Sequence, residues 1–100
     1  MSRFRHMLML TLVDDATPED RERLLAGFAR MPQAMDFIRR YEHGFDLGNL
    51  DGATADFGLV ADFDSEEDWR RYSAHPAHQE LVAVVRVVAA SMIRMQYHVE

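Results

Sequence analysis

Two histidines and a tyrosine, Tyr72, His75 and His78, lie within one short segment of the chain. Histidine changes its charge near neutral pH and is the side chain that most often acts as a general acid or base. Pro76 suits the first position of a helix, which would put His78 in the first helical turn. The helix dipole disfavours an imidazolium there, so His78 is predicted to be a neutral proton acceptor. Alternatively, both histidines only cap the helix and fix its connection.

Tyr72 follows Trp69 by about one helical turn, so both rings are predicted to point at the core. A buried tyrosine needs a hydrogen-bond partner for its hydroxyl. A carbonyl or enolate oxygen of a ligand would be such a partner, and the hydroxyl would then stabilise negative charge during a reaction. The other interpretation is a core tyrosine that is bonded to backbone or water.

His6 and Arg94 lie in segments that alternate like strands. His6 shares a face with Leu8, where it is either a core histidine or a ligand contact. Arg94 shares a face with Gln96. If that face is interior, the guanidinium needs an internal acid or an anionic ligand as its partner. If the alternation is shifted by one residue, Arg94 faces a partner subunit or solvent.

A metal site is not expected. His75 and His78 are three residues apart and His6 could approach them, but Pro76 separates the two and no acid stands at an obvious fourth position. The chain has no cysteine, which excludes disulfides, a thiol nucleophile and cysteine-based metal sites. All eleven basic residues are arginine, which excludes a catalytic lysine.

The 100 residues predict one domain over residues 1–100, and the net charge of −6 argues against a nucleic-acid surface. The longest apolar stretches, 8–13 and 81–90, are far shorter than the roughly 20 residues of a membrane span. The first residues lead into a strand-like segment and not into a signal peptide. We therefore expect a soluble cytoplasmic protein without membrane contact.

The elements that must position these groups follow from hydrophobic periodicity and cap residues. Thr17 and Pro18 begin a helix that Pro32 ends or interrupts, and further helices begin after Ser65 and at Pro76. Strands are predicted over 4–13, 37–46, 55–63 and 92–99. The segment 81–88 fits either a strand, by its β-branched residues, or a helix, by its apolar spacing. The order predicts an α+β fold, a ferredoxin-like split βαβ with a four-stranded antiparallel sheet and helices on one face.

Four segments together resemble the stress-responsive dimeric A/B-barrel (Dabb) family over almost the whole chain. They are Phe-Arg-His-Met-Leu-Met-Leu at 4–10, the acidic helix start at 14–19, Ala-Asp-Phe at 61–63, and Tyr-Ser-Ala-His-Pro-Ala-His at 72–78. The resemblance implies a homodimer that packs sheet against sheet into an α+β barrel. It also favours a helix over 81–90. Met7, Met9 and Val60, which a monomer would expose on the bare sheet face, would then form the interface.

The family includes plant polyketide cyclases, which close a ring by aldol condensation without metal or cofactor. Their catalytic tyrosine and histidine correspond to Tyr72 and His78, and a pocket histidine corresponds to His6. Phe57 stands where those cyclases have a second pocket histidine, and Gln96-Tyr97 replaces an Asp-Tyr pair. We expect the remaining substrate contacts from seven residues: Leu8, Phe28, Tyr41, Phe57, Leu59, His75 and Arg94.

The resemblance therefore predicts a small cofactor-free enzyme with one cavity per subunit between sheet and helices. It would act on an apolar, oxygenated small molecule by proton transfer, with His78 as base, Tyr72 as oxyanion donor and His6 as an orienting group. The alternative is a non-catalytic, stress-responsive dimer that binds a ligand. A haem- or metal-dependent oxygenase on the same fold is a more remote alternative.

Overall fold

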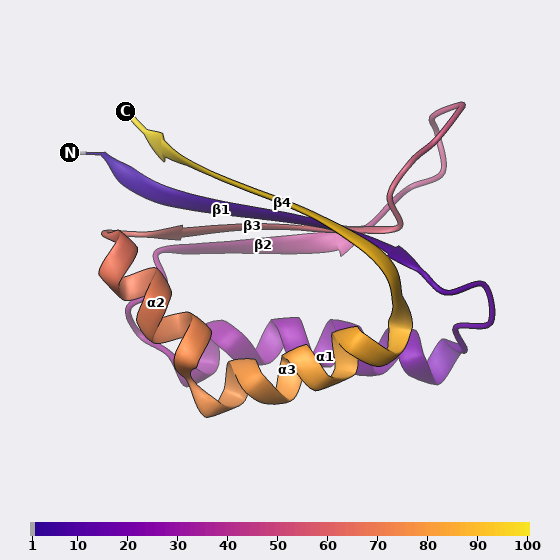
Figure 1. Cartoon of the computed structure of the whole chain (residues 1–100), viewed down its shortest axis with the longest axis horizontal. Coiled ribbons are helices and arrows are strands. Elements are labelled where there is room, and N and C mark those ends of the chain that lie inside the picture. Colours follow the sequence, from indigo (N-terminus) through magenta and orange to yellow (C-terminus); the bar gives the residue numbers. More distant parts are fainter. Residues whose placement is uncertain (1) are drawn as a thin grey trace.

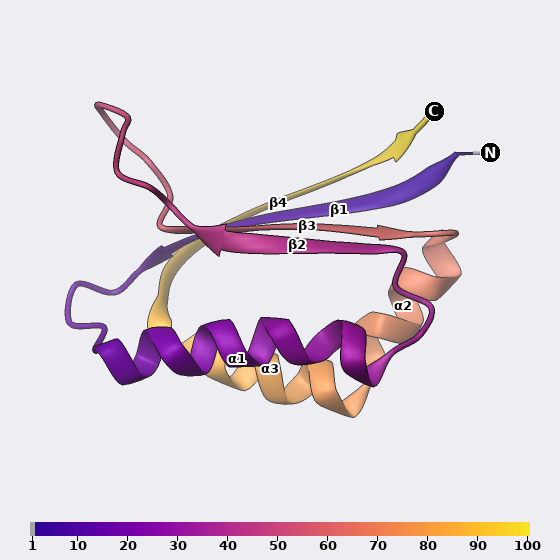
Figure 2. The same cartoon turned by 180° about the vertical axis from the view of Figure 1, so that it is seen from behind.

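A computed structural model describes residues 2–100, so Met1, the first residue of the predicted domain, lies outside the described part. Four strands, β1 (Arg3–Leu12), β2 (Arg40–Phe45), β3 (Phe57–Phe63) and β4 (Ala89–Val99), form one antiparallel sheet in the order β2-β3-β1-β4. Three helices, α1 (Pro18–Ala34), α2 (Glu66–Ala74) and α3 (Pro76–Val88), lie on one face of this sheet (Figures 1 and 2). The predicted ferredoxin-like α+β fold is confirmed.

The predicted helix starts are confirmed by their caps. The Thr17 hydroxyl accepts the Asp20 backbone N–H at 3.1 Å, and the Asp20 carboxylate accepts the Thr17 N–H at 3.0 Å. This reciprocal capping box satisfies two backbone donors at the start of α1. At the start of α2 only one of these two bonds is present: the Ser65 hydroxyl accepts the Asp68 N–H at 3.1 Å.

Several element bounds differ from prediction. The segment 81–88 is helical, but the helix that the family resemblance favoured over 81–90 ends at Val88, and β4 begins at Ala89, three residues earlier than predicted. The first strand lies one residue earlier than predicted, and β3 begins at Phe57 and not at residue 55. The second strand is shorter than predicted and begins at Arg40. Helix α1 continues past Pro32 to Ala34, where the Met35 N–H still donates to the Met31 carbonyl. A proline this near the end of a helix removes only one hydrogen bond of the last turns.

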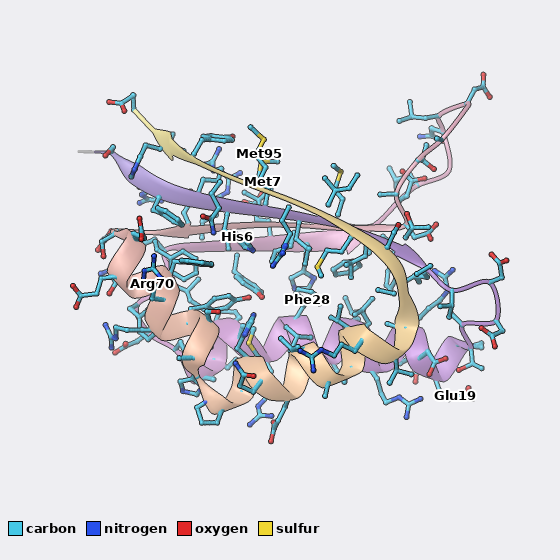
Figure 3. All side chains as sticks on the ribbon, in the orientation of Figure 1. His6, Met7, Glu19, Phe28, Arg70 and Met95 are labelled. Atoms are coloured by element: carbon cyan, nitrogen blue, oxygen red, sulfur yellow. The ribbon has the colours of Figure 1, made fainter. Side chains whose placement is uncertain are left out.

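The core lies between the helices and one sheet face, here called the inner face. Leu10, Phe28, Phe57 and Phe63 are fully buried there, because strand alternation points every second side chain toward the helices. Figure 3 shows His6 and Phe28 in the space between sheet and helices. The predicted alternation of the first strand is confirmed.

The opposite, outer face carries Met7, which the register pairs with Met95 on β4 and Val60 on β3. Figure 3 shows Met7 and Met95 on the side of the sheet away from the helices. The most exposed apolar side chains of this face belong to the last strand: Ile93 is 65% exposed and Met95 is 59% exposed. For this face Met7, Met9 and Val60 were predicted, but these β4 residues were not. The outer face is therefore more apolar than was predicted.

A loop over residues 46–56 rises from the sheet on the outer side, at the upper right of Figure 1. Between this loop and the strands lies a hollow of about 590 Å³, lined by Met9, Leu50 and Ile93 among others. Gly48 and Gly52 adopt positive φ in the loop, at 79° and 85°, a conformation that glycine adopts without steric cost. Leu50 is left exposed at the loop.

Asp62 is a buried carboxylate on the outer face, with 1% of its surface exposed. The Arg5 guanidinium donates to both of its oxygens, from Nε at 2.7 Å and from Nη2 at 2.9 Å. Arg3 adds a looser contact at 3.8 Å. The bidentate hydrogen bonds from Arg5 hold the pKa of Asp62 below its usual value, so the carboxylate stays ionised.

Over residues 2–100, no helix combines the length and hydrophobicity that crossing a membrane requires.

Candidate active site

A cavity of about 250 Å³ lies between the inner sheet face and the helices. It brings together both predicted catalytic residues, Tyr72 and His78. Of the predicted substrate contacts it includes His6, Leu8, Phe28, Leu59 and Arg94. The larger hollow on the outer face contains none of the histidines. The smaller, inner cavity is therefore the candidate active site.

His78 occupies the third position of α3 and lines the cavity. Its Nδ1 lies 3.1 Å from the Ser73 carbonyl oxygen. A carbonyl only accepts, so Nδ1 carries the ring proton and Nε2 keeps a free lone pair. Within residues 2–100, no side chain or backbone group is hydrogen-bonded to Nε2. Burial lowers the pKa of His78, so this imidazole is neutral at pH 7 and accepts a proton at Nε2.

Tyr72 is 2% exposed and its ring centroid lies 4.5 Å from that of His78. Its hydroxyl forms a hydrogen bond of 2.8 Å with the hydroxyl of Tyr41. Burial raises the pKa of Tyr72 to about 12, and the hydrogen bond with Tyr41 acts in the opposite direction. Either hydroxyl can donate in this bond, and when Tyr41 donates, the Tyr72 proton is available to an oxygen in the cavity.

His6 lies on β1 with its Nδ1 3.0 Å from the Gln96 side-chain nitrogen. An amide nitrogen donates, so Nδ1 accepts and the ring proton is on Nε2. Burial first, and then the positive charge of Arg94 and the His78 ring, lower the pKa of His6 to about 4. His6 is therefore a neutral hydrogen-bond donor at physiological pH. It complements His78, which is an acceptor.

The register pairs Arg94 with Leu8, which places Arg94 on the cavity side and not on the outer face. Of the two alternatives for Arg94, the unshifted alternation therefore holds. Its guanidinium nevertheless remains open to solvent and needs no internal acid, because β4 is an edge strand whose residues 90–98 are all exposed.

Three predicted substrate contacts do not line the cavity. His75 is the N-cap of α3, and its Nδ1 accepts the Ala77 N–H at 3.0 Å, which is the capping role that was the alternative. Phe57 packs in the core against Phe28, with ring centroids 4.9 Å apart. Tyr41 reaches the site only through its hydroxyl bond to Tyr72.

Several cavity residues were not predicted, chiefly Trp69, Ser73, Val82 and Arg86. The apolar stripe of α3 was visible in the sequence, but it also fits a core helix. Arg86 follows Val82 by one helical turn, so its position became predictable only once 81–88 was known to be helical.

Within residues 2–100, no three histidine, aspartate or glutamate side chains converge where they could hold a metal ion.

The chain is similar to known proteins in sequence and in structure. The stress responsive A/B barrel domain matches residues 4–99. A curated relative, the stress-response A/B barrel domain-containing protein HS1 of Arabidopsis thaliana, is 31% identical over 83 residues, which are 80% of this chain and 74% of the relative.

Solved structures share the fold. A dimeric ferredoxin-like protein of unknown function from Thermobifida fusca superimposes with a TM-score of 0.89 at 30% identity, covering 98% of this chain and 92% of that chain. The hydroxynitrile lyase of Passiflora edulis superimposes with a TM-score of 0.86 at 15% identity, covering 98% of this chain and 94% of the lyase chain. At that identity the likeness shows the fold alone.

Proposed function

The chain belongs to the stress-responsive A/B barrel family, and from this premise we propose that it is a cofactor-independent enzyme of acid–base chemistry. The substrate is a small, apolar, oxygenated molecule bound in the inner cavity. A volume of about 250 Å³ lies just below the roughly 300–1,000 Å³ of sites for drug-sized ligands, which favours a smaller substrate.

One observation carries this proposal: His78, with an unbonded Nε2, and Tyr72 both line one cavity, and their ring centroids are 4.5 Å apart. His78 Nε2 removes a proton from carbon next to a carbonyl, and the Tyr72 hydroxyl donates to the enolate oxygen that forms. The Nε2–H of His6 binds a second substrate oxygen and orients it. The lowered pKa values of His78 and His6, which leave both imidazoles neutral at pH 7, support these roles.

The reaction that fits best is an aldol-type ring closure, as in the family's polyketide cyclases. The enolate carbon attacks a second carbonyl carbon of the same molecule, and a C–C bond forms while that carbonyl becomes an alkoxide. The imidazolium of His78 then returns its proton to the alkoxide. Protons and electrons balance without a further reactant.

We also propose that two chains associate through the outer face. The Thermobifida fusca protein, 30% identical, is described as dimeric. Large apolar side chains left open on a soluble protein mark an interface, and Met9, Ile93 and Met95 are such side chains. Stable interfaces of this kind bury upwards of about 2,000 Å².

A second candidate function is binding without catalysis. The Tyr72 hydroxyl and His78 Nδ1 both already have protein partners, in Tyr41 and the Ser73 carbonyl. A cavity whose polar groups are satisfied in this way also suits a protein that only holds a ligand.

The test uses the first chemical step. The protein is incubated in D₂O with a simple ketone such as 4-phenyl-2-butanone, and exchange of the α-protons is followed by NMR. Tyr72→Phe deletes one hydroxyl and is expected to slow exchange by about 10²–10³, the usual cost of losing an oxyanion donor. His78→Gln is expected to abolish it, whereas His98→Gln, a histidine outside the cavity, leaves the rate unchanged.

Native exchange rates in both Tyr72→Phe and His78→Gln would exclude the catalytic assignment. Ketone binding without any accelerated exchange in the native protein would favour the second candidate, a binding protein.

A further inference from the structure

The arginines of this chain divide into two groups by their partners. Eight of the eleven form ion pairs with aspartate or glutamate. A ninth, Arg21, lies over the Phe45 ring at 5.4 Å. Among residues 2–100, only Arg86 and Arg94 have neither an acidic partner nor an aromatic ring beneath them, and both line the inner cavity.

The charge of the cavity is opposite to that of the whole chain. The chain carries 17 aspartate and glutamate residues against 11 arginines, for a net charge of −6. None of those acids is among the residues that line the cavity, which include the charged side chains of Arg86 and Arg94. The cavity is therefore positive in an otherwise acidic molecule, and it attracts anions.

The two guanidinium groups come from opposite sides of the cavity. Arg94 is on β4, where the register pairs it with Leu8, and Arg86 is on α3, one turn after Val82. Both residues are exposed although they line the cavity, so they lie where it meets solvent. Deeper in the cavity, the lining residues Leu8 and Leu81 are buried and apolar.

We infer that the ligand of this cavity is a carboxylate with an apolar body, whose anionic group binds Arg86 and Arg94 at the mouth while the body enters between sheet and helices. This inference rests on the proposed function, because it names the chemical class of that site's ligand. Arginine presents a planar set of N–H donors that matches a carboxylate in two-point contacts. Two such groups without acids of their own are available for this contact.

The electrostatics of His6 support the inference. The charge of Arg94 contributes to the low pKa of His6, after burial. A neutral His6 does not compete with the arginines for the anion. It remains a donor to an oxygen of the ligand body, so charge recognition and orientation fall to different residues.

The experiment compares two probes of the same shape, 4-phenylbutanoate and 4-phenylbutanamide, by titration followed with protein NMR at low salt. The native protein is expected to bind the carboxylate about tenfold more tightly than the amide, since exposed ion pairs contribute up to about fivefold each. Arg86→Gln and Arg94→Gln are each expected to weaken carboxylate binding several-fold and to leave amide binding unchanged. The matched control is Arg23→Gln, which removes the same charge from an exposed arginine on α1 outside the cavity.

Equal affinity for the two probes would overturn the inference and leave the proposed function standing. So would equal weakening of both probes by Arg86→Gln or Arg94→Gln, or an effect of Arg23→Gln as large as theirs. Binding of neither probe would overturn both proposals. A carboxylate preference in a protein whose Tyr72→Phe and His78→Gln variants both keep native ketone exchange would support the inference while refuting the catalytic role.

Discussion

The hydrogen bond between the Tyr41 and Tyr72 hydroxyls gives the sharpest test of how the site is held. The two oxygens are 2.8 Å apart, and Tyr72 is 2% exposed. Tyr41→Phe removes one hydroxyl and leaves the other without its partner in a buried position. A lost neutral hydrogen bond costs about 1 kcal/mol, and an unsatisfied buried hydroxyl costs about 1–3 kcal/mol. We expect each single variant to lower the free energy of unfolding by about 1.5 kcal/mol.

The double variant Tyr41→Phe/Tyr72→Phe is expected to cost no more than either single one. Replacing both partners by apolar groups of the same shape leaves no hydroxyl unsatisfied. The double-mutant cycle formed by these variants therefore gives a coupling free energy of about 1.5 kcal/mol. Independent sites would give only a few tenths of a kcal/mol.

Urea unfolding, followed by circular dichroism, measures all four proteins. The protein concentration must be the same throughout, because association of two chains makes apparent stability depend on concentration. Strict additivity, with a double-variant cost of about 3 kcal/mol, would refute the hydrogen bond as the link between these residues.

Two further predictions concern the outer face. Asp62→Asn breaks a buried ion pair whose other member is partly exposed, and is expected to cost about 3 kcal/mol in urea unfolding at pH 7. The folded-state pKa of Asp62 is lowered, so its stabilisation is complete above the unfolded pKa of about 3.9 and lost as the pH falls through the lower folded value. Between pH 5 and pH 2, about the range in which Asp62 titrates, the free energy of unfolding of Asp62→Asn should therefore fall less than that of the native protein. Equal falls in the two proteins would contradict this. Met95→Glu is expected to give monomers in sedimentation. Leu25→Glu, which also places a glutamate at an exposed apolar position but on α1, is expected to leave the dimer intact. An unchanged sedimentation coefficient for Met95→Glu would contradict the interface.

The sequence predicted the parts of the fold that local chemistry determines. Strand alternation placed His6 and Met7 on opposite faces of the sheet. Neighbouring side chains in a strand point to opposite faces, and the face with the apolar core residues is the one toward the helices. Thr17 and Pro18 located the start of α1, because a cap is a contact between residues that are close in sequence.

The sequence did not determine what depends on distant contacts. The β-branched run 81–88 satisfies both helical and strand patterns, and packing against the sheet decides for the helix. The partnership of Tyr41 with Tyr72 joins two elements that are far apart in the chain. His75 and His78 look equivalent in the sequence, yet the ring of His75 turns back to its own helix start while that of His78 reaches the cavity.

Strand β1 contributes to two surfaces from one backbone: His6 and Leu8 line the cavity, and Met7 between them belongs to the outer face. Any displacement of this backbone moves both surfaces at once. If a ligand occupies the cavity and the chains associate as proposed, such a displacement would link the two events thermodynamically. If the dimer binds a ligand more tightly than the monomer by some factor, the ligand must strengthen the dimer by the same factor per site. Dilution of the protein is then itself a means of releasing the ligand.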